Sequence, residues 1–283
     1  MKLARWLATF TMASSACAAG ANATRVSEER TAPASASAVE PQHADAQADA
    51  SGQAAADQAI AAALSKVSTA RELAPLGPVK GRVIALSEMV AHVDRDLDED
   101  TPPEVARGTT DLLYALGTVA DSFDYRASVL ELMRAELMGF YAPREKTMFL
   151  RGDLQGTERD ATLWHELVHA LQDQHYDLEK LIAYRADAGD EQSAVHALAE
   201  GDATSVMLDV VLSDKNKRAI DIDQPLLDMQ SAVSAGTLQQ VPPILKRSII
   251  APYLDGLAFV NALRRRGGWA AVDAAWRRLP TST

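Results

Sequence analysis

The sequence predicts an α+β fold that is mainly α-helical, with a small β element directly before a helix that carries histidines. Two observations carry this prediction. Apolar residues recur at helical spacing through most segments between residues 75 and 283. The exception is GFYAPREKTMFLRG, residues 139–152, in which aromatic and aliphatic residues flank a Pro-Arg-Glu-Lys turn, as in a β-hairpin.

The first 23 residues have the features of a cleaved secretory signal peptide. Lys2 and Arg5 precede the apolar stretch Trp6–Ala19, and Ala21-Asn22-Ala23 is the small-x-small pattern that a signal peptidase recognises. The apolar stretch is shorter than the roughly 20 residues that a membrane-spanning helix needs. The protein is therefore expected to be exported, to the periplasm or the extracellular space.

The single cysteine, Cys17, lies within this signal. Acylation of Cys17 would make the protein a lipoprotein, and membrane attachment is expected only in that case. Ser14 argues against it, because a large aliphatic residue usually stands at that position. A mature chain without cysteine has neither disulfides nor thiolate metal ligands, so any metal must bind to histidine and carboxylate. Cleavage also removes two positive charges, which takes the net charge from −11 to −13 and argues against a nucleic-acid partner.

Residues 24–74 are predicted to be a disordered spacer rich in Ala, Ser, Asp and Gln. The stretch SASAVEPQHADAQADASGQAAADQ shows neither strand nor sustained helix periodicity before Ile60. A short helix around Ala54 to Ser68 is one alternative, because alanine is the best helix former. An inhibitory pro-segment is another. From residue 75 to 283 the composition is that of one globular domain.

The domain is expected to contain a succession of helices around the hairpin. Pro103 is well placed in a first turn, and Pro252 is expected to bend or split the helix that contains it. The segments with helical spacing are 88–100, 104–121, 128–138, 190–212, 243–266 and 268–279, in addition to the helix that carries the histidines.

That helix contains LWHELVHALQDQH, residues 163–175. His165 and His169 are one turn apart, so both imidazoles can bind one ion, and Glu166 can reach a water on that ion without being a ligand. This is the H-E-x-x-H pattern, in which the glutamate acts as the general base. The alternative is an amphipathic helix with buried histidines, but such a helix has no reason to place an unpaired glutamate among uncharged neighbours.

A di-iron site is a second metal interpretation, because Glu166-x-x-His169 is also the ligand pair that a helix contributes to a di-iron bundle. Such a bundle needs a second E-x-x-H. The only other instance is Glu40 to His43 in the spacer, so the sequence disfavours this site.

Three residues, His175, Glu200 and His196, compete to be the third metal ligand. His175 has the metzincin spacing, but Gln172 replaces the glycine at which that helix turns, so a continuing helix would point His175 away. Glu200 lies on the next strongly apolar helix and would complete a His2Glu set. The following Gly201 is typical of a close approach by another backbone, although Glu200 and Asp202 could instead form a solvated patch at a helix break.

Two residues could support the ligands. His196, one turn before Glu200, is either another ligand or a residue that contacts one. Asp173, four residues after His169, is expected either to accept the free imidazole N–H of His169 or to be an exposed aspartate near the helix end.

HELVH followed by a glutamate on a later helix resembles the gluzincin branch of zinc-dependent peptidases, the thermolysin-like and peptidase-MA-like group. The resemblance covers roughly residues 135–212 and implies a zincin-like catalytic domain with one Zn²⁺ per chain. It implies His165, His169 and Glu200 as the zinc ligands and Glu166 as the general base. It also suggests that GFYAPREKTMFL supplies an edge strand to which an extended peptide substrate adds.

HELVHALQDQH with ALAEGDA further resembles a set of little-characterised secreted or envelope bacterial proteins, as does PYLDGLAFVNALRRRGGWAAVDAAW near the C-terminus. Two features depart from the pattern. Thr204 stands where thermolysin-like proteins have an aspartate that supports a histidine ligand, so this support is unassigned. The chain ends in RRLPTST, where the proteins it resembles continue, so we expect that the catalytic domain is truncated at its C-terminus.

The sequence thus predicts a secreted or periplasmic zinc-dependent peptidase that acts on peptide or protein substrates. The alternative is a zinc-containing binding or scaffold module without turnover, against which the presence of Glu166 argues. The group that stabilises the developing oxyanion cannot be chosen from sequence, and the candidates are Tyr176, Tyr184, Tyr253, His175 and His196.

Overall fold

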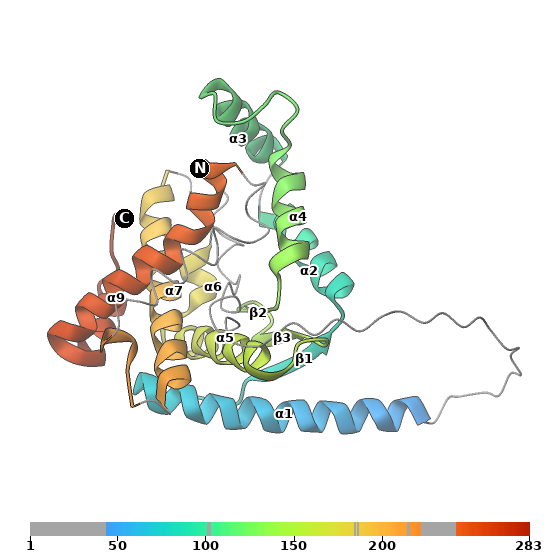
Figure 1. Cartoon of the computed structure of the whole chain (residues 1–283), viewed down its shortest axis with the longest axis vertical. Coiled ribbons are helices and arrows are strands. Elements are labelled where there is room, and N and C mark those ends of the chain that lie inside the picture. The colour runs from blue at the N-terminus through green and yellow to red at the C-terminus, as the bar shows by residue number, and fades with distance from the viewer. Residues whose placement is uncertain (1–43, 101–102, 184, 186, 214–215, 222–241) are drawn as a thin grey trace, which may run out of the picture.

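A computed structural model of the protein describes residues 44–100, 103–183, 185, 187–213, 216–221 and 242–283. These residues form a mainly helical structure with one three-stranded sheet, so the predicted α+β class is confirmed (Figure 1). The signal peptide and Cys17 lie outside the described residues. Within the described ranges, none of the helices combines the length and the hydropathy that a membrane span requires.

The sheet contains the predicted hairpin and one additional strand. Strands β2 (Gly139–Ala142) and β3 (Thr147–Arg151) pair antiparallel, with Tyr141 opposite Met148, which confirms the hairpin. Strand β1 (Lys80–Ile84), which the sequence did not predict, pairs parallel with the other side of β3. The order β1-β3-β2 leaves β2 at one edge of the sheet.

Each predicted helical segment contains a helix, but the segment predicted at 104–121 is helical only to Ala115, and the one predicted at 128–138 ends at Glu136. Pro103 is the first residue of its helix, as expected, but the last long helix runs through Pro252 and departs from helical geometry only at Gly267 and Gly268. The helices are α1 (Ala44–Arg71), α2 (Leu86–Asp100), α3 (Pro103–Ala115), α4 (Tyr125–Glu136), α5 (Gly156–Tyr176), α6 (Leu178–Ile182), α7 (Gly189–Leu212) and α9 (Pro243–Arg277), with a short 3-10 turn at Ala219–Asp221.

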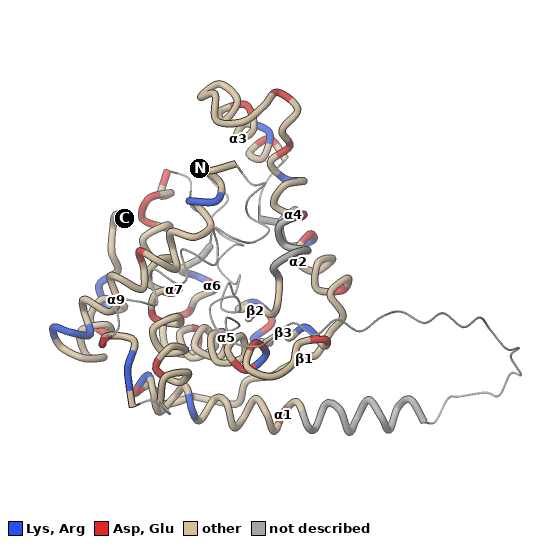
Figure 2. The backbone as a smooth tube through the Cα atoms, viewed as in Figure 1, with Lys and Arg blue, Asp and Glu red and all other residues tan. Residues whose placement is uncertain are grey.

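Helix α1 corrects the predicted disordered spacer. Residues 24–43 of that segment lie outside the described residues, but residues 44–71 form one helix along one side of the molecule (Figure 1). Its second half carries few charges (Figure 2) and buries Ile60, Leu64 and Val67 against α5 and the sheet. Three aliphatic side chains at helical spacing therefore bury enough surface to hold this segment against the core.

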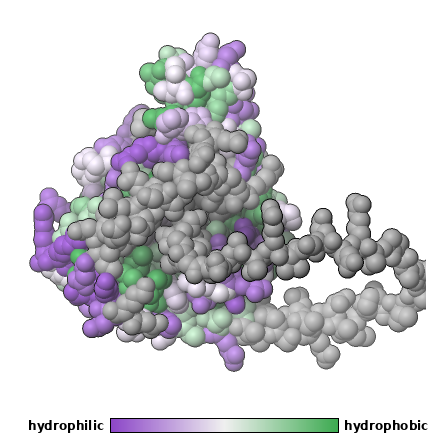
Figure 3. Space-filling view, viewed as in Figure 1, coloured by the Kyte–Doolittle hydropathy of each residue, from purple (hydrophilic) through white to green (hydrophobic). Residues whose placement is uncertain are grey.

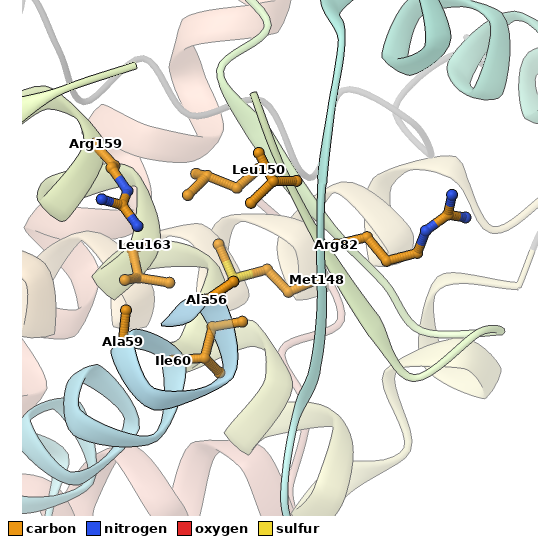
Figure 4. A pocket seen from close by; sticks show the side chains of 9 residues that line it. Ala56, Ala59, Ile60, Arg82, Met148, Leu150, Arg159 and Leu163 are labelled. Atoms are coloured by element: carbon orange, nitrogen blue, oxygen red, sulfur yellow. The ribbon is translucent and has the colours of Figure 1, made fainter. Parts of the chain in front are cut away.

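Helix α1 also borders a small apolar pocket, which Figure 4 shows between α1, the sheet and the start of α5. None of the residues proposed as metal ligands lines this pocket. Its lining residues are Ala56, Ala59, Ile60, Arg82, Val83, Met148, Leu150, Arg159 and Leu163.

Helix α5 is the central helix, since all but one of its residues from Ala161 to Asp173 are buried. It packs against α1, α7 and β2. By contrast, α3 projects from the body of the molecule (Figure 1), with some hydrophobic surface exposed there (Figure 3). Leu112 of α3 and Leu116, directly after the helix, are both exposed. The histidine-bearing segment thus occupies the best-packed part of the fold.

Helices α7 and α9 cross with their backbones in contact. A Cβ atom placed on Gly201 would lie 2.1 Å from the carbonyl carbon of Gly256, and one on Gly256 would lie 2.0 Å from the carbonyl oxygen of Ala197. No side chain fits at either position, so both must be glycine for the helices to approach this closely. The close approach predicted from Gly201 is confirmed, and it fixes the position of the neighbouring residue, Glu200.

Candidate metal centre

The imidazoles of His165 and His169 converge from successive turns of α5. Their Nε2 atoms lie 3.1 Å apart, and their side chains are almost fully buried. Their rings meet edge to face. The helical spacing that suggested a shared ion therefore brings the two nitrogens together as expected.

Glu200 of α7 supplies the third donor atom. Its Oε2 lies 3.0 Å from Nε2 of His165 and 3.5 Å from Nε2 of His169. A tetrahedral ion with bonds of 2.0–2.1 Å needs donor atoms separated by about 3.3–3.4 Å. The three observed separations bracket that value, so this buried group can hold a metal ion.

The other two candidates for the third ligand have different partners. Helix α5 continues to Tyr176, which directs His175 away from the pair, and Nε2 of His175 lies 2.7 Å from the carbonyl oxygen of Ala74. His196 is buried, and its Nε2 lies 3.3 Å from Oε1 of Glu200, the oxygen that faces away from the histidine pair. His196 thus supports the carboxylate of Glu200.

The residue that contacts Nδ1 of His169, the ring nitrogen that faces away from the other ligands, is Gln172 and not Asp173. Oε1 of Gln172 lies 2.9 Å from Nδ1 of His169, and the Asp173 carboxylate instead accepts hydrogen bonds from the Tyr141 hydroxyl and Lys146 Nζ. The prediction that Asp173 accepts the imidazole N–H is therefore wrong, and so is its exposed alternative, because Asp173 is buried. A residue three positions along the helix reaches the ring here, whereas Asp173 turns toward the hairpin.

Glu166 is held by the edge strand. The backbone N–H of Tyr141 in β2 donates a hydrogen bond of 2.8 Å to Oε2 of Glu166, and both residues are buried. The Tyr141 hydroxyl is 2.8 Å from Oδ2 of Asp173, two helical turns further along α5. Tyr141 therefore fastens β2 to α5 at two points and orients the carboxylate of Glu166.

The charges of the cluster influence one another strongly. Burial alone would lower the pKa of His169, but the Glu200 carboxylate raises it to about 9. Burial alone would raise the pKa of Glu200, but the charge of His169 and hydrogen bonds from the histidines hold it well below its usual range. The site therefore favours a positive charge beside Glu200, as either a proton or a metal ion.

The structure narrows the candidates for a group that stabilises an oxyanion. The ring of Tyr253, on α9, stacks on His165 with centroids 6.0 Å apart. Tyr176 instead donates a hydrogen bond to Asp273, and Tyr184 lies outside the described residues. Among the described candidates, Tyr253 and His196 lie at the cluster.

Two of these contacts were not predicted from the sequence. The bond from Tyr141 to Glu166 uses a backbone group, which every non-proline residue has. The sequence prediction used Gln172 only as the residue that replaces the metzincin glycine, although an amide three residues after His169 on a mainly apolar helix is a signal that could have identified it.

Comparison of the chain with protein-family models, with curated proteins and with solved structures gave no match.

Proposed function

We propose that this protein is an exported zinc-dependent peptidase of the gluzincin type, with His165, His169 and Glu200 as the zinc ligands and Glu166 as the general base. The observation that carries the proposal is the convergence of three neutral or anionic donor atoms, 3.0–3.5 Å apart, beside a fourth group, Glu166, that is fixed separately. Two imidazoles, one carboxylate and an open position are the ligand set of a catalytic zinc site.

A zinc ion bound there would polarise a peptide carbonyl and lower the pKa of a water to about 7. Glu166 would take a proton from the attacking water and deliver it to the amide nitrogen, whose bond to the carbonyl carbon then breaks. The hydrogen bond from the Tyr141 N–H holds one carboxylate oxygen of Glu166 in place. Because the cluster is buried, these charges act in a medium of low dielectric constant.

Strand β2 would align the substrate. It is an edge strand, and its backbone faces the general base through the Tyr141 N–H. All four residues of β2 are buried and the Tyr141 N–H is bonded to Glu166, so an extended peptide would displace these contacts when it pairs with this edge and would then lie close to Glu166. Tyr253, stacked on His165, would lie beside the developing oxyanion.

The test uses the full chain, loaded with zinc, and a mixed peptide library. Glu166→Gln should retain zinc and lose hydrolysis by roughly 10²- to 10⁴-fold, because the amide cannot accept the proton. Glu158→Gln, an exposed change at the start of the same helix, is the matched control and should cleave like the wild type.

Hydrolysis by Glu166→Gln at the wild-type rate, or hydrolysis that survives removal of zinc by a chelator, would contradict the proposal. Zinc binding without any hydrolysis by the wild type would instead support the zinc-containing binding module.

A further inference from the structure

The side-chain amide of Gln172 connects the two helices that bear the metal ligands. Gln172 is fully buried on α5, three residues after His169. Its Oε1 is 2.9 Å from Nδ1 of His169, and its Nε2 is 3.0 Å from the carbonyl oxygen of Ala199. Ala199 directly precedes Glu200 on α7, so one amide touches a ligand imidazole and the backbone beside another ligand.

The orientation of this amide follows from the hydrogen-bonding capacity of its neighbours. A backbone carbonyl only accepts hydrogen bonds, so the NH2 group of Gln172 must face Ala199. The amide oxygen then faces His169, which requires Nδ1 of His169 to carry a proton and donate it. The reverse orientation would place two acceptor oxygens against each other in a buried site, at the energetic cost of an unsatisfied buried polar group.

We infer that Gln172 is a positioning residue of the metal centre. By donating to the Ala199 carbonyl, its amide holds His169 in the Nδ1–H form, which leaves Nε2 as the nitrogen that binds the ion. Nε2 is the atom that lies 3.1 Å from Nε2 of His165 and 3.5 Å from Oε2 of Glu200. The same amide ties α5 to α7 next to Glu200. This inference rests on the proposed metal site.

Gln174 provides a matched comparison on the same helix. Its Oε1 accepts a hydrogen bond of 2.7 Å from the N–H of Leu76, and its Nε2 donates one of 3.1 Å to the carbonyl oxygen of Gly77. Both amides thus accept one bond and donate another, but Gln174 binds the loop before β1, and Gln172 binds the site. Replacing each of them separates an effect on the metal from a general loss of hydrogen bonds.

The experiment measures the zinc dissociation constant of the full chain by competition with a chelating dye, together with the thermal stability of the metal-free protein. Gln172→Met should weaken zinc binding by roughly 10- to 100-fold, the usual effect of losing a partner that orients a histidine ligand. Gln174→Met should leave the dissociation constant unchanged. Gln172→Glu, which keeps an acceptor for the Nδ1 proton, should bind zinc more tightly than Gln172→Met.

A second readout does not depend on affinity or activity. In ¹⁵N NMR spectra of the zinc-loaded wild type, the His169 ring should show a protonated Nδ1 and a zinc-bound Nε2. Zinc bound through Nδ1 would overturn the inference.

The remaining outcomes separate the inference from the proposed function. If the wild type binds zinc but Gln172→Met binds it equally well, or if both methionine variants weaken it equally, the inference fails and the metal site stands. If the wild type binds no zinc, the metal site fails and the inference fails with it. If zinc binds without hydrolysis, the peptidase proposal fails, while a selective effect of Gln172→Met still supports the inference.

Discussion

Helix α7 carries two fully buried carboxylates, Glu200 and Asp202, whose surroundings differ. Asp202 accepts hydrogen bonds from Nε of Arg71 at 2.7 Å and from the indole N–H of Trp276 at 2.9 Å. Glu200 is approached by three imidazoles, those of His165, His169 and His196. Two residues along a helix correspond to about 200° of rotation, so the two side chains leave α7 in nearly opposite directions.

The difference shows which carboxylate has a structural role. A buried charge is tolerated when a partner neutralises it, and the guanidinium of Arg71 is a permanent cation. Imidazoles are neutral unless they bind a proton, so Glu200 obtains its positive partner only from solution. Asp202 thus belongs to a closed ion pair that docks α1, whereas Glu200 belongs to a site that can exchange a proton for a metal ion.

Removing the cation that pairs with Asp202 should have the largest effect on stability. Arg71 is fully buried and also contacts Asp273 and the ring of Trp269. Arg71→Met should lower the free energy of unfolding by about 3–5 kcal/mol, because it leaves Asp202 buried without a counter-charge. Urea unfolding of the metal-free protein measures this change.

Arg82→Met is the control, since Arg82 pairs with Glu88 at 3.3 Å with both side chains more than half exposed. Its effect should stay below about 1 kcal/mol. An equally small effect of Arg71→Met would mean that the buried pair does not hold α1 to the domain.

A smaller effect should appear in the pH dependence of the metal-free protein. The Glu200 carboxylate raises the pKa of His169 from its ordinary 6.5 to about 9, against the effect of burial. A raised pKa stabilises the fold fully below the unfolded value, and this stabilisation is lost as the pH rises through about 9. Urea unfolding with a chelator present should therefore show lower stability at about pH 10 than at about pH 6.

Glu200→Gln removes the carboxylate that raises this pKa, so its stability should fall less over the same pH interval. Zinc affinity should change in the opposite direction and increase with pH, because the ion and the proton compete for His169. Equal pH dependence in the wild type and Glu200→Gln would contradict the assignment of His169 and Glu200 as a coupled pair.

The parts of the site that follow helical periodicity were predictable from the sequence. His165 and His169 are four residues apart, so one helix suffices to bring them together, and Gly201 indicated the close crossing that places Glu200. The arrangement around them was not predictable. Gln172 and Asp173 lie about 60° and about 40° to either side of His169 around the helix, so periodicity does not choose between them. The hairpin that bonds Asp173 decides which one contacts His169.

The errors in the predicted fold have a similar origin. Strand β1 was missed because its residues alternate poorly, with two adjacent exposed positions at Arg82 and Val83. The sequence predicts a spacer in place of α1 because the larger buried residues of this helix, Ile60, Leu64 and Val67, are few and lie in a segment composed mainly of small and polar residues. Helix α1 is stabilised by contacts with α5 and β1, and β1 is stabilised by contacts with β3 and α1, which local sequence patterns do not reveal.

The most direct test is the zinc content of the purified full chain for the wild type, Glu200→Gln and Asp202→Asn. The wild type should hold one zinc per chain, Glu200→Gln should fold and lose it, and Asp202→Asn should be less stable but keep one zinc per folded chain. Full zinc content in Glu200→Gln, or loss of zinc from a folded Asp202→Asn, would contradict the division between a metal-binding and a structural carboxylate on α7.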